Sequence, residues 1–223
     1  MLKHISFACT TALLALAAPA NAGWVASWSA SPHAPVAREG RLAAASFDNV
    51  TLSQTLRISE GGTKVRIRLS NRYGAVPLDI GAARIVRIDP AGKEIPGSSR
   101  PLTFSGDASI VIPRGAPFLS DAVALDVPAL SRLKVEFYLP KATGPCTCHL
   151  TGLDELAISP PGNHVGKPWE PASKQAFRAF LSSVEVDSSG ALGTIVTFGD
   201  SITVGAGSTP GANRRRPDIL GVC

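Results

Sequence analysis

Apolar and polar residues alternate with a period of two between about residue 47 and residue 186. In the stretch KVRIRLS at 64–70, lysine and arginine occupy positions 64, 66 and 68, and valine, isoleucine and leucine fill the positions between and after them. Successive side chains of a β-strand point to opposite faces of a sheet, so this stretch predicts a strand with one buried face. Further runs of this kind predict strands at 52–58, 78–89, 109–112, 132–140 and 177–186.

Turn-forming residues separate these runs. Gly61-Gly62 lies between the runs 52–58 and 64–70 and predicts a hairpin turn there. The stretch ISPPGNHVGKPWEP at 158–171 is rich in proline and predicts a long loop. Short strands dominate and almost no stretch has a helical period. We therefore expect a mainly β fold, with a β-sandwich or jelly roll over residues 23–186.

The pattern changes after residue 186. Asp187–Gly190 has the composition of a linker. The stretch LGTIVTF at 192–198 is apolar on both faces, which is typical of a strand covered on both sides in an α/β sheet. Gly-Asp-Ser follows at 199–201, where such a strand would lead into a helix. We expect residues 187–223 to hold a linker and the first strand and turn of an α/β domain.

Residues 1–22 have the pattern of a signal peptide. Lys3 provides the positive start, Ile5–Ala18 form an apolar segment too short to span a bilayer comfortably, and Ala20-Asn21-Ala22 fits the cleavage rule. A buried N-terminal helix is the alternative, which the proline and small residues near its end disfavour. We expect a mature chain that begins at Gly23, a secreted or periplasmic location, and no transmembrane segment elsewhere.

The composition fits a chain with a buried core. Of the 223 residues, 44% are hydrophobic and 17% are charged. The net charge of +5 becomes +4 without the signal peptide, and Arg214-Arg215-Arg216 is the only basic run. A surface that binds nucleic acid usually carries clustered lysine and arginine. We therefore expect a solvated segment at 214–216 and no nucleic-acid partner.

Four cysteines bear on redox state and metal binding. Cys9 leaves with the signal peptide, so Cys146, Cys148 and Cys223 remain in an oxidising compartment. The stretch CTCH offers Cys146, Cys148 and His149 as metal ligands, but zinc sites prefer a C-x2-C spacing and no fourth ligand is evident. We expect a local disulfide or two buried thiols at 146 and 148, a free thiol at Cys223, and neither metal nor cofactor.

Ser201 is the candidate nucleophile. A serine hydroxyl becomes nucleophilic when a base takes its proton, and a turn after a strand would expose it beside backbone N–H groups that stabilise an oxyanion. Gly199 allows a tight turn, and Asp200 is expected to cap the following helix or to fix the loop. A plain turn with Ser201 or Asp200 as its N-cap is the alternative on these three residues alone.

Other glycine-rich loop motifs are excluded by single positions. The stretch lacks the lysine of a phosphate-binding loop. A dinucleotide-binding loop would need glycine where Pro210 stands, and the α/β-hydrolase elbow would need glycine where Thr203 stands.

The stretch VTFGDSITVGAGS closely resembles the first sequence block of the SGNH hydrolases, also called the GDSL lipase/esterase family. The stretches at 24–32, 56–74 and 143–152 look like the N-terminal β domain that precedes this block in a group of secreted members. The resemblance covers nearly the whole mature chain. It implies hydrolysis of an acyl ester, of a lipid or of an acylated carbohydrate, without a cofactor.

The same resemblance implies the roles of the block residues. Ser201 would be the nucleophile, and its backbone N–H would join the oxyanion hole. Gly199 and Asp200 match the block as structural residues. The family's later blocks supply an oxyanion glycine, an oxyanion asparagine and an Asp-x-x-His pair, but the 22 residues after Ser201 contain no histidine. Asn213 lies too near Ser201 for the asparagine role, and Arg216 stands where we would expect a tryptophan.

The resemblance thus implies an SGNH enzyme that is truncated after its first block and inactive by itself. His33, His149 and His164 are expected to be exposed or packed rather than to act as the base. The alternative is a non-catalytic exported β-sandwich that binds carbohydrate or a partner. Trp24, Trp28 and Trp169 would then offer stacking surfaces, although Trp24 and Trp28 are expected to pack in the core or at the domain junction.

Overall fold

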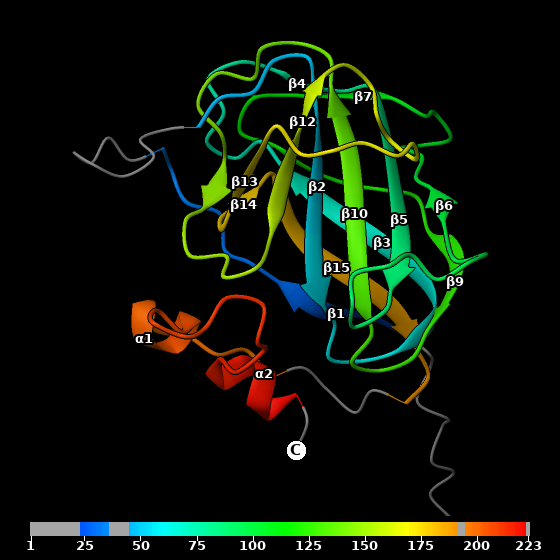
Figure 1. Cartoon of the computed structure of the whole chain (residues 1–223), viewed down its shortest axis with the longest axis vertical. Helices are drawn as coiled ribbons and strands as arrows, with labels where there is room; N and C mark the ends of the chain where they lie inside the picture. Colours follow the sequence, from blue (N-terminus) through cyan, green and yellow to red (C-terminus); the bar gives the residue numbers. More distant parts are fainter. Residues whose placement is uncertain (1–22, 36–44, 191–194, 222–223) are drawn as a thin grey trace, which may run out of the picture.

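The chain is seen here in a computed structural model that describes residues 23–35, 45–190 and 195–221. The predicted signal peptide at 1–22 and Cys223 lie outside the described residues. Within the described part, two antiparallel sheets face each other across a shared apolar core, so the predicted mainly β fold is confirmed. Figure 1 shows β12, β2, β10 and β5 in front, with β3 and β15 crossing behind them.

The rear sheet has the strand order β1-β15-β3-β8, and β9 also pairs with β3. Its strands are β1 (Gly23–Ser29), β15 (Leu181–Ser188), β3 (Gly62–Ser70), β8 (Pro117–Leu119) and β9 (Val123–Val127). β15 runs on to Ser188 because Trp24 and Gly23 of β1 pair with Asp187 and Ser188. The predicted linker therefore begins later than residue 187.

The front sheet has the order β13-β12-β2-β10-β5-β6. Its strands are β13 (Ser173–Gln175), β12 (Leu156–Pro161), β2 (Val50–Arg57), β10 (Arg132–Leu139), β5 (Ala82–Ile88) and β6 (Arg100–Pro101). Two small pairs complete the described strands: β4 (Leu78–Ile80) with β7 (Ile110–Ile112), and β11 (Cys148–His149) with β14 (Arg178–Ala179).

The core lies between the two sheets and follows the alternation that the sequence predicts. In β3, the apolar positions are fully buried while Lys64, Arg66 and Arg68 lie on the outer face. Alternate apolar residues of the facing strands point into the same core. Burial of each large apolar side chain stabilises the folded state by about 1.5–3 kcal/mol. These core residues are Leu52, Leu56, Val65, Ile67, Leu69, Ile85, Leu133, Val135, Phe137, Val184 and Val186.

The predicted hairpin at Gly61-Gly62 is wrong. β2 belongs to the front sheet, where β10 and β12 flank it, whereas β3 belongs to the rear sheet beside β15. The connection between them therefore crosses from one sheet to the other. Glycine is needed because neighbouring backbone comes close: a Cβ on Gly61 would lie 2.6 Å from the carbonyl oxygen of Val127, and one on Gly62 would lie 2.6 Å from that of Asp187.

The predicted loop at 158–171 begins later than expected. Leu156, Ala157 and Ile158 pair with β2, and the strand continues through a register shift to Pro161. Proline in a sheet is confined to edges and irregular positions because it lacks the N–H donor, and this register shift accommodates both prolines. The segment 162–172 then crosses the outer face of the front sheet, in yellow in front of β10 in Figure 1.

The C-terminal segment, residues 195–221, contains two short helices, α1 (Ser201–Val204) and α2 (Arg216–Leu220). The strand predicted at 192–198 is not formed over 195–198, the part that the structure describes. Ile195, Val196 and Phe198 are 81%, 80% and 100% exposed, because no described strand lies beside them. Neither α1 nor α2, the helices in the described residues, is long enough to cross a membrane.

Candidate functional site

The turn that carries Ser201 is built by its immediate neighbours. Asp200 is the N-cap of α1, and its Oδ1 atom accepts the backbone N–H of Ile202 at 2.9 Å. Gly205 ends the helix in the left-handed conformation, and its N–H donates to the carbonyl oxygen of Ser201 at 3.0 Å. A Cβ on Gly199 would collide with the side chain of Thr203. Ser201 is exposed at the first position of the helix.

The described histidines make contacts elsewhere. The Nδ1 atom of His149 lies 2.8 Å from the carbonyl oxygen of Ser31, and its ring packs against that of His33 at 4.9 Å. Burial lowers the pKa of His149, so its neutral form is favoured. The Nε2 atom of His164 lies 3.2 Å from the carbonyl oxygen of Pro161. None of these hydrogen bonds involves Ser201, so within residues 23–35, 45–190 and 195–221 no histidine is hydrogen-bonded to it.

The C-terminal segment contacts the sandwich through residues 152–154. The N–H of Gly211 donates to the carbonyl oxygen of Leu153 at 2.7 Å, and Arg215 donates to that of Gly152 at 3.2 Å. Arg215 also lies 3.7 Å from Asp154. Figure 1 shows α1 and α2 outside the two sheets.

Asp154 pairs with a buried arginine. Arg178 is 1% exposed, lies 2.7 Å from Asp154 and packs 5.3 Å from the ring of Trp28. Burial lowers the pKa of Arg178 to about 10, which leaves it charged at neutral pH. This pair joins the C-terminal segment to the interior of the sandwich and gives Trp28 a structural contact.

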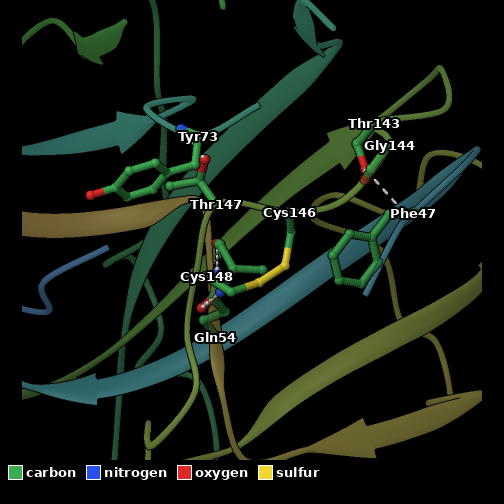
Figure 2. Close-up of a disulfide and its surroundings, with 9 residues drawn as sticks. Phe47, Gln54, Tyr73, Thr143, Gly144, Cys146, Thr147 and Cys148 are labelled. Atoms are coloured by element: carbon green, nitrogen blue, oxygen red, sulfur yellow. Dashed lines mark hydrogen bonds between the residues drawn. A yellow bond between two sulfur atoms is a disulfide. The ribbon is translucent and has the colours of Figure 1, made fainter. Parts of the chain in front are cut away.

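The CTCH stretch forms a disulfide between Cys146 and Cys148 (Figure 2). Both cysteines are buried, and Figure 2 draws Phe47 and Gln54 among their neighbours. The N–H of Phe47 donates to Thr143 Oγ1 at 3.1 Å, which anchors the adjoining loop. Of the two predicted states the structure therefore contains the disulfide, and neither sulfur is a thiolate that could ligate a metal. The described residues hold no group of three or more histidine, cysteine, aspartate or glutamate side chains suited to a metal.

A cleft of about 680 Å³ lies on the outer face of the front sheet, and we call it the outer cleft. Its floor is formed by outward side chains of β2, β5, β10 and β12, and its walls by the loop after β5 and the segment 162–172. Trp169 lines it from this segment and is half-buried. The other two tryptophans have structural contacts, since Trp24 packs 4.1 Å from the guanidinium of Arg66 and Trp28 packs against the core.

Charged residues at the floor of the outer cleft form one network. The Nε atom of Arg84 donates to Glu136 at 2.6 Å, and its other nitrogens donate to Glu94 at 2.6 and 3.0 Å. Lys134 lies 2.6 Å from Glu94. Burial opposes the charge of Arg84, but the two carboxylates outweigh it and raise the pKa of the guanidinium. Arg84 is therefore charged across the physiological range.

The sequence singled out Trp169 but missed Arg84, Glu94, Lys134 and Glu136. Charged residues at the alternate positions 132, 134 and 136 of the run 132–140 indicate that one face of this strand is charged and points outward. No local pattern indicates that the segment 162–172 crosses that face and turns it into a cleft.

Comparison of the chain with protein-family models, and with curated proteins, returns no match.

Proposed function

We propose that Ser201 is the nucleophile of a secreted serine ester hydrolase of the SGNH type, and that this chain carries the N-terminal part of that enzyme. The observation that carries the proposal is the exposed position of Ser201 in a turn built by Gly199, Asp200 and Gly205. The resemblance of VTFGDSITVGAGS to the first SGNH block supports the same role.

In this reaction the Oγ atom of Ser201 attacks the acyl carbon of an ester while a base takes the hydroxyl proton. The alcohol leaves with a proton, and water then hydrolyses the acyl-enzyme, which releases the acid and restores the serine. The SGNH resemblance implies that the base belongs to an Asp-x-x-His pair in a later block. The proposal assigns that pair to residues C-terminal to this sequence.

The exposed apolar side chains of Ile195, Val196 and Phe198 support this assignment. In a complete α/β sheet they would belong to a strand covered on both faces. Burial of each would contribute about 1.5–3 kcal/mol, so a sheet that covered these side chains would be stabilised by them.

The test compares the chain with a protein extended by the residues encoded after codon 223. With p-nitrophenyl acetate, we expect the chain and its Ser201→Ala variant to hydrolyse the ester at the same background rate. The extended protein is expected to turn over, with a loss of about three orders of magnitude or more in kcat on Ser201→Ala. Ser208→Ala, a serine of the same segment, is the matched control and should keep full activity. Equal turnover by the extended protein and its Ser201→Ala variant would refute the proposal.

A second candidate function is carbohydrate binding by the sandwich itself, and the outer cleft favours it. Trp169 offers an aromatic ring inside a cleft rich in hydrogen-bonding groups, the combination that orients a ligand within a pocket. This function needs no residue of the C-terminal segment. Saccharide binding that survives Ser201→Ala, together with no ester turnover by the extended protein, would favour this function over the first.

A further inference from the structure

The outer cleft carries positive charge that its carboxylates leave uncompensated. Five basic and three acidic side chains line it. Arg84 and Lys134 pair with Glu94 and Glu136, and Lys174 lies 2.9 Å from Glu155.

Two cations remain after these pairings. Arg132 donates to the carbonyl oxygen of Pro90 at 3.0 Å, and Lys167 donates to that of Asn163 at 3.2 Å. Neither forms an ion pair with a carboxylate among the described residues. Each could therefore pair with an anionic group of a ligand.

The segment that carries Lys167 and Trp169 is held on the sheet before any ligand arrives. Glu136, 2% exposed, accepts the backbone N–H of Gly166 at 3.1 Å as well as the Nε–H of Arg84. Gly166 has a positive φ of 75°, a conformation that glycine adopts at no steric cost.

Thr51 of β2 makes a second attachment. Its Oγ1 donates to the carbonyl oxygen of Gly162 at 3.1 Å and accepts the N–H of His164 at 2.9 Å. The segment 162–172 is thus held by Glu136 and by Thr51. Because it is already ordered, it loses little conformational freedom when a ligand binds, and this favours affinity.

The remaining wall groups suit a sugar ring. Trp169 lines the cleft together with the apolar side chains of Pro168, Pro171, Ile88 and Pro90. Aromatic faces stack on the C–H faces of sugars, and the serine and threonine hydroxyls of the β2 floor can bond sugar hydroxyls.

We infer that the outer cleft binds an acidic saccharide, with a sugar ring stacked on Trp169 and carboxylates held by Arg132 and Lys167. The inference rests on the second proposed function, carbohydrate binding, and adds the class of ligand. Two cations on separate elements suit a chain that bears one carboxylate per sugar, whereas a polyphosphate backbone is met by clustered lysine and arginine. The planar guanidinium of Arg132 matches a carboxylate with two parallel hydrogen bonds.

The test uses the purified chain, tryptophan fluorescence and calorimetry with three probes. These are a hexamer of galacturonate, the same hexamer with its carboxyl groups reduced to alcohols, and a single-stranded oligonucleotide of matched charge. We expect the galacturonate hexamer to bind at least tenfold more tightly than either of the others. Arg132→Gln combined with Lys167→Gln, and separately Trp169→Ala, should each weaken its binding tenfold or more.

Arg114→Gln is the matched control, because Arg114 is an exposed arginine outside the cleft with no ion pair among the described residues. It should leave the affinity within twofold of the unmodified chain. An unchanged unfolding midpoint in each variant shows that the sandwich is intact, and the fluorescence of Trp24 and Trp28 reports this in Trp169→Ala.

The outcomes separate the inference from the function on which it rests. Equal binding of the acidic and reduced hexamers would overturn the acidic ligand and leave carbohydrate binding standing. Binding of neither hexamer would overturn both. Equal binding of the oligonucleotide, or galacturonate binding that the cleft variants do not weaken, would also overturn the inference.

Discussion

The Ser201 turn and the outer cleft are held in place by contacts of very different range. Asp200 caps a residue two positions away, and Gly205 bonds back to Ser201 within the same turn. In the cleft, Arg84 and Glu136 are 52 residues apart. Contacts between near neighbours therefore shape the Ser201 turn, whereas the outer cleft forms only when distant strands pack together in the sandwich.

The cleft network is therefore expected to matter most for global stability. Glu136→Ala would leave the buried Arg84 with Glu94 as its one carboxylate partner in the described structure and would free the N–H of Gly166. Breaking a buried ion pair costs about 3 kcal/mol of the free energy of unfolding, measured by urea denaturation.

Glu155→Ala is the matched control for Glu136→Ala. Its partner Lys174 is 58% exposed, and an exposed pair contributes about 0–1 kcal/mol. Similar losses in the two variants would mean that the network does not support the sandwich.

The Ser201 turn should respond locally. Asp200→Ala removes the cap on Ile202 and costs about 1 kcal/mol within α1, which is about a fivefold faster amide exchange at Ile202. The urea midpoint of the sandwich should not move, because no contact of the Asp200 side chain leaves the turn in the described structure. Asp200→Asn keeps an acceptor and should restore most of the protection; a shifted midpoint would show that the turn is coupled to the sheets.

The smallest expected effect is the pH dependence contributed by Glu94. Burial raises the pKa of this half-buried carboxyl, but hydrogen bonds from Arg84 and Lys134 outweigh burial and lower it below its ordinary value of 4.5. The unfolded chain then binds more protons, so the contribution is present above the ordinary value and is lost as the pH falls through the folded value. Between about pH 6 and about pH 3, Glu94→Gln should show a shallower fall in the free energy of unfolding than the unmodified chain. Parallel curves would contradict this.

Strand positions were largely predictable because alternation is a local signal. The runs around Val65 and Val135 became β3 and β10 within about two residues. Partner choice was not predictable in this way: Gly61-Gly62 suits a hairpin by composition but serves a crossing between sheets. The end of β12 was also not predicted, because Pro160 and Pro161 are typical of a loop. The register shift that lets them lie in a strand depends on pairing with β2, which is distant in the chain.

The candidate functional residues also differ in whether near or distant parts of the chain position them. The cap at Asp200 and the exposure of Ser201 follow from residues next to each other. The disulfide was one of two open states for Cys146 and Cys148, and the apposition of the two cysteines chose between them. Trp169 stood out as an aromatic residue, but the cleft that it lines together with Arg132 and Lys167 arises from strands and loops that are distant in the chain.

The amino-acid sequence by itself determined which side chains face the core, where most strands run, and the turn that exposes Ser201. Each depends on the alternation of side chains along a strand or on hydrogen bonds within a few residues. Both are determined by residues that are close together in the sequence. Only the tertiary structure decided which sheet each strand joins and that segment 162–172 closes a charged cleft. Those outcomes depend on which distant groups meet, and Glu136 acquires its partners only when β5, β10 and that segment are packed together.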